Sequence, residues 1–541
     1  MPLPKSLSSS WSVQIYSLAN HRDRGTLLRI LKKTGAWGVP LKRIYDLLTL
    51  VGDEKGRLCK SVILETQYID RDFADAYSKL YGRSFYPYGR MCYRLHFFSR
   101  DFGSAEDLHI QSYSQERARL EALQQEYQGF CVIHPSQPDI VGRTVITPPI
   151  SQDHDQYLLC REEYGLNLAG LQLKAHGSPF IQQDCMVGAC ATAATWMAHM
   201  ALFKRYGLPT YSTTQITEIA DMAYPSPERV FPSEGLTVEQ IGVALKRMGH
   251  ETIILDIERT NPEAARHSLY HYVESSIPIV LGVKTQRGRH AMTIVGHTLS
   301  THPLRATPPV IEVELGAGMR NFRYHAADAW ITGLCLNDDQ RGPYRTAEIP
   351  ITRNARRTHI KMKDFPRSGV TTNFQLLAAI IPLPQHVYLL GDMAETKAAI
   401  MLSVIEALGL IDASFAGQNF VLRTLLRESN RFKTSLDVTE RDVPADLVWT
   451  YQKRHLPKYV WLIEISTLQL WNVNVPDKRI IGEILVDPTS NPNRLDAIVA
   501  NIAGHVWDMK PDDADILAAL RRDPIIIANW HPYKCLQRNS S

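Results

Sequence analysis

The segment at 180–200, "FIQQDCMVGACATAATWMAHM", limits more than any other how this chain can fold. From Cys190 onward it reads as a helix that is apolar on nearly every face, through residues such as Ala193 and Trp196. A helix without a polar face has to be buried, so we expect a helix at 188–206 in the centre of a domain.

The length of the chain implies several domains, because 541 residues exceed what one hydrophobic core supports. Residues 1–75 carry apolar side chains at three-to-four spacing and are expected to be helical. Residues 76–150 read as a mixed α/β region, 151–355 as the central domain, and 365–541 as a C-terminal α/β-type domain.

In the central domain, helices come first and strand-like runs follow, which indicates an α+β fold with an antiparallel sheet. The predicted strands are 276–284, 290–297, 309–315 and 330–338. In the C-terminal domain we expect strands at 459–467 and 478–487, with helices at 395–410 and 493–506.

Composition excludes several classes of protein. A net charge of +4 is too small to create a positive field that would attract nucleic acid or an anionic membrane surface. A content of 44% hydrophobic and 21% charged residues is ordinary for a soluble protein. No apolar run reaches the roughly 18–20 residues of a membrane-spanning helix, and the first residues lack a signal-peptide core. The eight cysteines are scattered along the chain, which indicates reduced thiols and not a disulfide framework. We therefore expect a soluble, cytoplasmic protein.

Cys190 is the first candidate for chemistry. A free thiol supplies little thiolate at neutral pH, but a helix N-terminus and a neighbouring imidazole both favour the anion. The "VGAC" stretch lets the backbone approach closely and places Cys190 at the start of the apolar helix. Cys185 precedes the helix, so Cys190 is the preferred nucleophile.

The base has to come from another part of the chain, and "GRHAMTIVGH" offers His290 and His297. Seven positions apart in a strand, they face opposite sides. His290 begins the strand, where its ring can reach a site, whereas His297 ends it and is expected on the surface or in a turn. The strand "WITGLCLNDDQRGPY" supplies Asn337 or Asp338 to orient the ring, and Asn337 is preferred.

An acyl-transfer site also needs donors for the developing oxyanion. The backbone N–H of Cys190 is one donor, and the side-chain amide of Gln182 or Gln183 is the other.

In this order the segments resemble the papain-like cysteine peptidase superfamily. "QQDCMVGACATAATWMA" is similar to its glutamine-to-nucleophile segment, and "GRHAMTIVGH" to its histidine strand, over roughly residues 165–350. The resemblance implies a papain-like central domain with these roles: Cys190 as nucleophile, His290 as general base, Asn337 or Asp338 as orienting residue, and Gln183 as oxyanion donor.

The sequence departs from papain's own branch in three ways. Ala191 replaces the aromatic residue after the nucleophile, no tryptophan follows Asn337, and Gln183 precedes Cys190 by seven positions, one more than in papain. The closer resemblance is to divergent bacterial branches. In the bacteriocin-processing branch the nucleophile follows an aspartate, as Cys185 follows Asp184 here, so Cys185 stays an alternative nucleophile.

The expected function is hydrolysis of a peptide or isopeptide bond through a Cys190 thioester. A protein or peptide substrate is implied, with a regulatory protein as a further partner and with no cofactor or metal. The alternatives are an acyl transferase or deamidase of the same fold, a catalytically inactive scaffold, and a nucleic-acid-binding protein using basic stretches such as 353–363.

Other polar clusters have structural interpretations beside functional ones. A zinc site from Cys185, Cys190, His290 and His297 is disfavoured, because the cysteine spacing is poor for zinc and the histidines face apart. The stretch with His134 and Arg143 is predicted to be a hairpin that docks the N-terminal region, with a ligand loop as the alternative. Three carboxylates of the C-terminal region could bind a metal: Glu464, Glu483 and Asp487. The preferred interpretation is that they are charges at the ends of strands.

Overall fold

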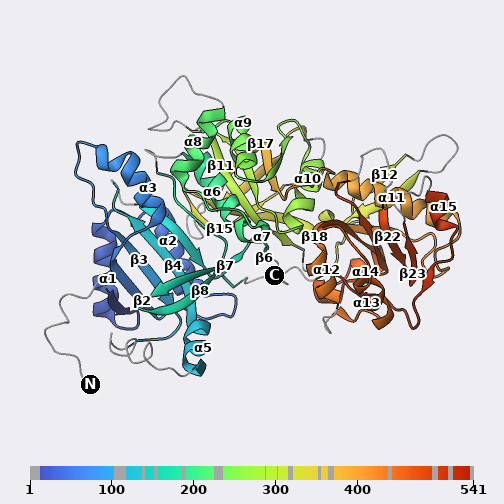
Figure 1. Ribbon diagram of the computed structural model, residues 1–541, viewed down its shortest axis with the longest axis horizontal. Helices are drawn as coiled ribbons and strands as arrows, with labels where there is room; N and C mark the ends of the chain where they lie inside the picture. The colour runs from blue at the N-terminus through green and yellow to red at the C-terminus, as the bar shows by residue number, and fades with distance from the viewer. Residues whose placement is uncertain are drawn as a thin grey trace.

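The computed structural model describes residues 13–102, 117–136, 140–150, 156–184, 189–223, 235–286, 288–300, 302–314, 321–350, 355–363, 371–436, 441–489, 497–509 and 516–536. Within these ranges, most strands belong to three large sheets that follow one another along the longest axis of the molecule (Figure 1). The N-terminal sheet is blue, the central one mostly green to yellow, and the C-terminal one orange to red.

The N-terminal sheet has five antiparallel strands in the order of the sequence. They are β1 (Val13–Ser17), β2 (Ser61–Tyr68), β3 (Cys92–Phe98), β4 (Tyr127–His134) and β5 (Ile140–Ile146), with helices α1 (His21–Lys33), α2 (Val39–Asp46), α3 (Arg71–Lys79) and α5 (Arg117–Glu126).

The prediction of a purely helical region at 1–75 is therefore too simple. Helical spacing holds for α1 and α2, but β1 and β2 are strands of the sheet. The run from Val62 to Leu64 is buried between β1 and β3, and pairing with distant strands overrides the local pattern there.

The central sheet closes on itself, because β10 pairs with both β11 and β17. The ring runs β10 (Ile279–Thr285), β11 (Gly288–Leu299), β14 (Ile331–Asp338), β15 (Gly342–Glu348), β16 (His359–Lys363) and β17 (Thr371–Leu383). Strands β6 (Gln156–Leu158) and β9 (Glu251–Asp256) extend it, and β7 (Glu162–Leu168) pairs with β8 (Leu171–Gly177). The helices are α6 (Cys190–Met200), α7 (Phe203–Tyr206), α8 (Thr213–Ala223), α9 (Val238–Arg247) and α10 (Pro262–Glu274).

Helix α6 is the predicted central helix. Every residue from Ala191 to Met200 is buried, as expected for a helix that lacks a polar face. The helix packs on β11, and the Thr293 hydroxyl donates a hydrogen bond of 3.0 Å to the carbonyl of Ala194. This contact fixes the middle of α6 against the middle of β11.

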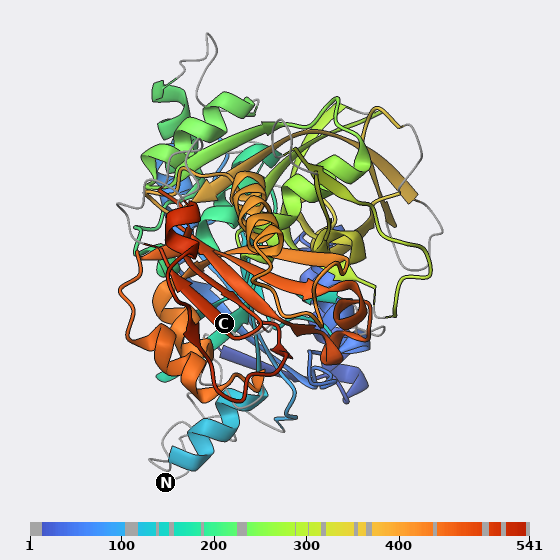
Figure 2. The same ribbon diagram turned by 90° about the vertical axis from the view of Figure 1, so that its right-hand side faces the viewer.

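The C-terminal sheet carries helices on both faces. Its order is β12 (Ile311–Val313), β13 (Phe322–Ala326), β18 (Phe420–Glu428), β19 (Tyr459–Thr467), β21 (Gly482–Val486), β22 (Ala497–Ile502), β23 (His505–Asp508) and β24 (Ile525–Ile526). Helix α11 (Gly391–Ala407) covers one face, as Figure 2 shows, while α12 (Ser429–Leu436) and α13 (Ala445–Gln452) pack on the other. Short elements complete the region: η4 (Ala327–Trp330), α14 (Leu468–Trp471), β20 (Arg479–Ile480), α15 (Ile516–Leu520) and β25 (Tyr533–Lys534).

Three expectations differ from the arrangement of these strands. The predicted strand at 309–315 contributes β12 to the C-terminal sheet, and β17, beyond the expected boundary at 365, belongs to the central sheet. The helix predicted at 493–506 is wrong: its described part forms β22 and β23, which pair with each other and with β21. Short apolar runs fit a strand or a helix equally well, and here the neighbouring strands decide.

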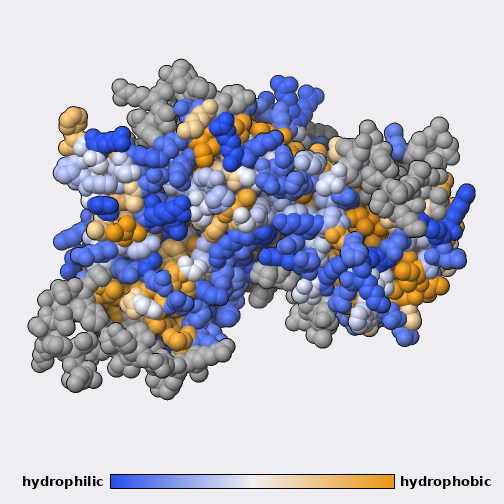
Figure 3. Space-filling view, viewed as in Figure 1, coloured by the Kyte–Doolittle hydropathy of each residue, from blue (hydrophilic) through white to orange (hydrophobic). Residues whose placement is uncertain are grey.

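Hydrophilic side chains cover most of the face drawn in Figure 3, and hydrophobic ones gather in separate areas, one of them near α8 and α9. Among the helices of the described ranges, none combines the length and apolar composition needed to cross a bilayer.

Candidate active site

Cys190 is the first residue of α6. The residue before it, Ala189, has no side chain that could cap the first-turn N–H groups. Cys190 is partly exposed as a residue, whereas the other cysteines of the described ranges are buried: Cys59, Cys92, Cys131, Cys160, Cys335 and Cys535. Burial raises the pKa of Cys59, Cys131 and Cys160 to about 12. Among the described cysteines, Cys190 is therefore the one that is not buried, and it is the first residue of a helix.

His290 lies near the start of β11, where its side chain is largely buried. Its Nε2 atom is 3.1 Å from Oδ1 of Asp338, at the end of the paired strand β14. The Cys190 thiol is among the groups whose interaction with the imidazole raises the pKa of His290. Nδ1 of His290 is buried and has no hydrogen-bond partner among the described residues, so it is the ring nitrogen available to the thiol.

The surroundings of His290 favour its charged form. Burial lowers the pKa of the imidazole, but hydrogen bonds with Asp338 and Cys190 and the charges of Asp338 and Asp339 outweigh burial and raise it to about 10. At neutral pH the ring is an imidazolium. A cation next to the Cys190 thiol stabilises the thiolate, which is the nucleophilic form.

Asp338 is held as a carboxylate by several donors. Besides His290, its oxygens accept hydrogen bonds from the Gln340 N–H at 2.9 Å and the Arg341 guanidinium at 3.0 Å. Burial raises the pKa of Asp338, but these partners lower it below its ordinary value. The adjacent Asp339 lies 3.5 Å from His290 Nε2, and burial together with the charge of Asp338 raises its pKa to about 7. Sequence analysis did not single out Asp339, although it adjoins the predicted pair.

Asn337 faces away from His290. Its amide nitrogen donates to the Ser178 hydroxyl at 3.2 Å and to the Pro179 carbonyl at 3.0 Å, and its oxygen accepts from the Tyr344 N–H at 3.1 Å. Successive side chains of a strand alternate between its faces, so only one of two neighbours can meet the histidine. Of the two orienting candidates, Asp338 contacts His290, while Asn337 anchors the chain leading to the nucleophile.

The approach to Cys190 is held by the N-terminal sheet. Phe180 pairs with Thr144 of β5 through two backbone hydrogen bonds of 2.9 Å. The Gln182 side-chain oxygen accepts a hydrogen bond from the Val141 N–H at 3.1 Å, which ties this side chain to the hairpin. The next residue, Gln183, is half-buried. Cys185, the alternative nucleophile, lies outside the described residues.

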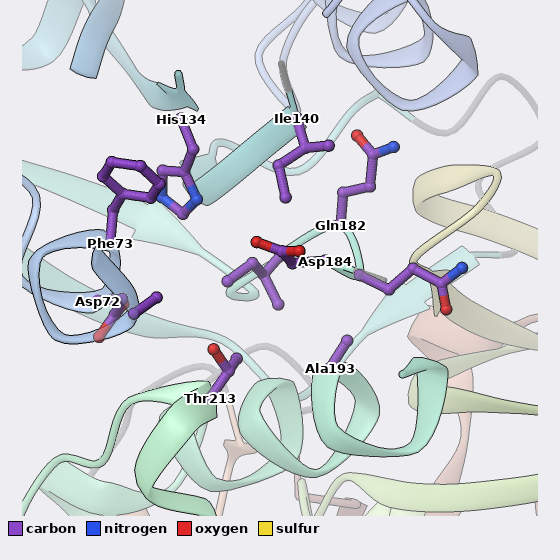
Figure 4. Close-up of a pocket in the computed structure, with 11 residues that line it drawn as sticks. Asp72, Phe73, His134, Ile140, Gln182, Asp184, Ala193 and Thr213 are labelled. Carbon is purple, nitrogen blue, oxygen red and sulfur yellow. The ribbon is translucent and has the colours of Figure 1, made fainter. Parts of the chain in front are cut away.

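A small cavity lies at this junction (Figure 4). The N-terminal region contributes Asp72 of α3 and His134 of β4, and the central domain contributes Gln182, Asp184 and Ala193. Ala193 is three residues beyond Cys190, so the cavity adjoins the first turn of α6. His134 stands out in the sequence, but no local pattern indicates that α3 reaches the same place, because that contact depends on how two domains pack.

The β4–β5 hairpin itself is present as predicted, with His134 and Arg143 bound to the N-terminal region. His134 Nε2 lies 3.5 Å from Asp70 Oδ1, and Arg143 donates to Asp72 at 2.9 Å. Hydrogen bonding and the positive charges of His134 and Arg143 outweigh burial and lower the pKa of Asp70 to about 2.

The remaining candidates have partners within the protein. The expectation that His297 lies on the surface is wrong: the side chain is fully buried, with Nε2 2.6 Å from Glu274, because β6 and β14 flank its strand. Glu464 pairs with Arg423 at 2.6 Å, and Glu483 accepts a hydrogen bond from Asn501 at 2.9 Å. Asp487 accepts the N–H of Thr489 at 2.8 Å in a turn.

Two groups in the described part of the chain bring ligand-type atoms within 4.8 Å of one another. One is His290 with Asp338 and Asp339, and the other is His267 with His271 and Glu395. In the first group, Arg341 and the Gln340 N–H already bind Asp338, and His290 faces the thiol. The second group has no such competing cation on its carboxylate among the described residues.

Comparison with known proteins gives little beyond this geometry. No family model matches the chain, and no curated protein matches it significantly. Among solved structures, it is similar to the peptidase domain of Streptococcus ComA, a bi-functional ABC transporter involved in a quorum-sensing pathway. The identity is 15% and the TM-score 0.18, over 38% of this chain and all of the ComA domain.

Proposed function

We propose that the protein is a cysteine-dependent acyl hydrolase that cleaves a peptide or isopeptide bond, with Cys190 as nucleophile. One observation carries the proposal: a partly exposed cysteine at an uncapped helix start is beside His290, whose Nε2 is bound to Asp338. A nucleophile, a base within reach and a third group that orients the base are the parts that covalent acyl transfer requires.

In the first half-reaction, the Cys190 thiolate attacks the carbonyl carbon of the scissile bond. Negative charge develops on the carbonyl oxygen, where the backbone N–H of Cys190 and the side-chain amide of Gln183 donate hydrogen bonds. The His290 imidazolium then gives its proton to the departing amine as the C–N bond breaks. A thioester remains on Cys190, and His290 is neutral.

In the second half-reaction, neutral His290 takes a proton from water, and the resulting hydroxide attacks the thioester carbonyl. The C–S bond breaks, the acid product leaves, and the thiolate–imidazolium pair is restored. Asp338 supports the charged ring in both halves by accepting its Nε2–H. Asn337 takes no part in the chemistry and instead holds the segment with Ser178 and Pro179.

The N-terminal region would help to select the substrate. It supplies α3 and the β4–β5 hairpin to the cavity next to α6, and it holds the chain that carries the glutamines. A substrate side chain next to the scissile bond would meet residues from both domains there.

Alkylation of the full chain with iodoacetamide between pH 5 and 9, followed by mass spectrometry of each cysteine, tests the proposal. Cys190 should react fastest and stay reactive below pH 7, where an ordinary thiol is mostly protonated. His290→Ala should remove that advantage, while the buried Cys59 and Cys131 should stay unreactive in both proteins. Equal rates for Cys190 and these two thiols would refute the nucleophile assignment.

A peptide library incubated with the wild type and with Cys190→Ala separates the possible reactions by product mass. Cleavage that depends on Cys190 indicates a peptidase. Products joined to an added amine indicate a transferase, and a gain of about one mass unit on glutamine or asparagine indicates a deamidase. If Cys190 is reactive but no product forms, the thiolate–imidazole pair is supported and the proposed hydrolysis is contradicted.

A further inference from the structure

We propose that His267, His271 and Glu395 form a binding site for a zinc-like divalent cation that joins the central and C-terminal domains. The site is separate from the Cys190 centre and does not rest on the proposed hydrolysis. The two histidines are on α10, and the glutamate is on α11. Figure 1 shows these helices next to each other where the two domains meet.

The three side chains converge on one point from two helices. His267 and His271 are four residues apart on α10, so they project from the same side of that helix. Their Nε2 atoms face the Glu395 carboxylate, at 3.6 Å for His267 and 3.2 Å for His271. Glu395 and His271 are fully buried, and the His267 side chain is 20% exposed, which leaves a way in for an ion.

The distances suit ligands of one ion better than direct ion pairs. A charge-assisted N–H···O bond is usually 2.7–2.9 Å long, shorter than both separations. Two ligand atoms that each lie about 2.0–2.1 Å from a tetrahedral zinc are about 3.3–3.4 Å apart, between the two observed values. Two imidazoles and one carboxylate are a common zinc ligand set, with water as the fourth ligand.

The groups behind the ligands hold them in the orientation that metal binding needs. The Nδ1 atom of His267 lies 3.0 Å from Asp328 Oδ1, so its Nε2 is the atom aimed at the site. Asp328 is in turn bound by Arg266 at 2.8 Å. The two oxygens of Glu395 accept hydrogen bonds from Tyr324 at 3.0 Å and Thr424 at 2.7 Å. This arrangement of carboxylate behind histidine, with a second pair of donors behind the ligating carboxylate, is typical of built metal sites.

The charges around the three side chains also favour a bound cation. Negative charge from Glu395, Asp328 and Asp392 acts on His267, and Arg266 supplies one fixed positive charge near by. In the metal-free protein these charges raise the pKa of His267 to about 9, so a divalent cation would bind in place of the proton on that ring. The nitrogen of His271 that faces away from the site, Nδ1, is buried and has no hydrogen-bond partner among the described residues.

Metal analysis of the full chain tests the site without any assay of activity. The wild type, exposed to zinc and then freed of loosely bound metal on a desalting column, should retain one zinc ion per chain by mass spectrometry of the metal. Replacement by cobalt should give the visible absorption bands of a tetrahedral Co²⁺ complex with nitrogen and oxygen ligands. His271→Ala and Glu395→Gln should each lose the zinc and the bands, and zinc should raise the melting temperature of the wild type alone.

Two control variants show whether the metal is bound at this cluster and not elsewhere. His302→Ala changes an exposed histidine and should retain the metal, and His290→Ala should retain it as well, which separates this site from the His290 cluster. The proposal is overturned if the wild type retains no zinc and gives no cobalt bands, or if His290→Ala releases the metal while His271→Ala keeps it. The cobalt spectrum of the wild type remains informative even where a variant does not fold.

Discussion

The Nε2 atom of His290, near the start of β11, lies 3.1 Å from Oδ1 of Asp338, at the end of the paired strand β14. This one hydrogen bond determines which ring nitrogen is left for the Cys190 thiol. It also keeps a carboxylate behind the imidazole, so that the positive charge needed beside a thiolate is stabilised in a buried place. The proposed chemistry depends on this relationship more than on any other contact.

Asp338→Asn should slow alkylation of Cys190 between pH 7 and 9, where His290 of the variant loses a proton that the wild type keeps. The substitution keeps the shape but removes a charge that raises the pKa of His290, and loss of such a partner shifts a pKa by about one to three units. The measurement is the rate constant for iodoacetamide at Cys190. Asn337→Ala is the matched control: it removes three buried hydrogen bonds, so it should destabilise the fold by about 1–3 kcal/mol and leave the His290–Asp338 contact intact. The opposite pattern would make Asn337 the orienting residue.

The stability of the protein should fall between pH 7.5 and 10 in a way that depends on His290. The folded protein raises the pKa of this histidine to about 10, above the value of about 6.5 in an unfolded chain. The proton is therefore bound more tightly in the folded state, and the stability it provides is complete below pH 6.5 and lost as the pH rises through 10. Melting temperatures of the wild type should decline more steeply than those of His290→Gln over this range. Starting at pH 7.5 leaves out most of the titration of Asp339, whose pKa is raised to about 7. Parallel curves for the two proteins would contradict the shifted pKa.

Gly142→Ala should loosen the junction between the N-terminal sheet and the approach to Cys190. A Cβ atom at this glycine would lie 2.1 Å from Nε2 of His134, so the ring would have to leave its place beside Asp70 and the cavity. We expect faster hydrogen exchange at residues 178–184 and slower alkylation of Cys190. Gly165→Ala is a suitable control, because a Cβ there meets nothing within 4 Å. Unchanged exchange in Gly142→Ala would show that the hairpin does not hold the approach.

Arg423→Leu should destabilise the contact between the central and C-terminal domains by about 3–5 kcal/mol. The buried guanidinium binds Glu274 of α10 at 2.7 Å and Glu464 of β19 at 2.6 Å, and its removal takes a close cation from two buried carboxylates, leaving Glu464 with Arg441 at 3.5 Å. Urea unfolding monitored by tryptophan fluorescence measures the change. Arg323→Leu breaks a solvent-exposed pair with Glu312 and should change stability far less than Arg423→Leu. Similar effects of both substitutions would mean that the buried network contributes no more than a surface ion pair.

The sequence by itself determined what local pattern can encode. The apolar residues on all sides of 190–200 required a buried helix, and the runs at 276–284, 290–297 and 330–338 are strands of one sheet. Cys190 at the helix start and His290 near a strand start followed from the same patterns. Burial and periodicity are properties of a short stretch of chain, so they can be inferred without knowing what the stretch packs against.

Only the tertiary structure decided which neighbours these elements would have. Sequence analysis preferred Asn337 over Asp338, but the pairing of β11 with β14 sets which face of the strand meets His290, and that face carries Asp338. In the same way, β22 is a strand and not a helix because β21 and β23 flank it. The cavity beside α6 and the cluster of His267, His271 and Glu395 each join segments from different domains. Strand partners and domain contacts are long-range choices, and no local pattern of residues specifies them.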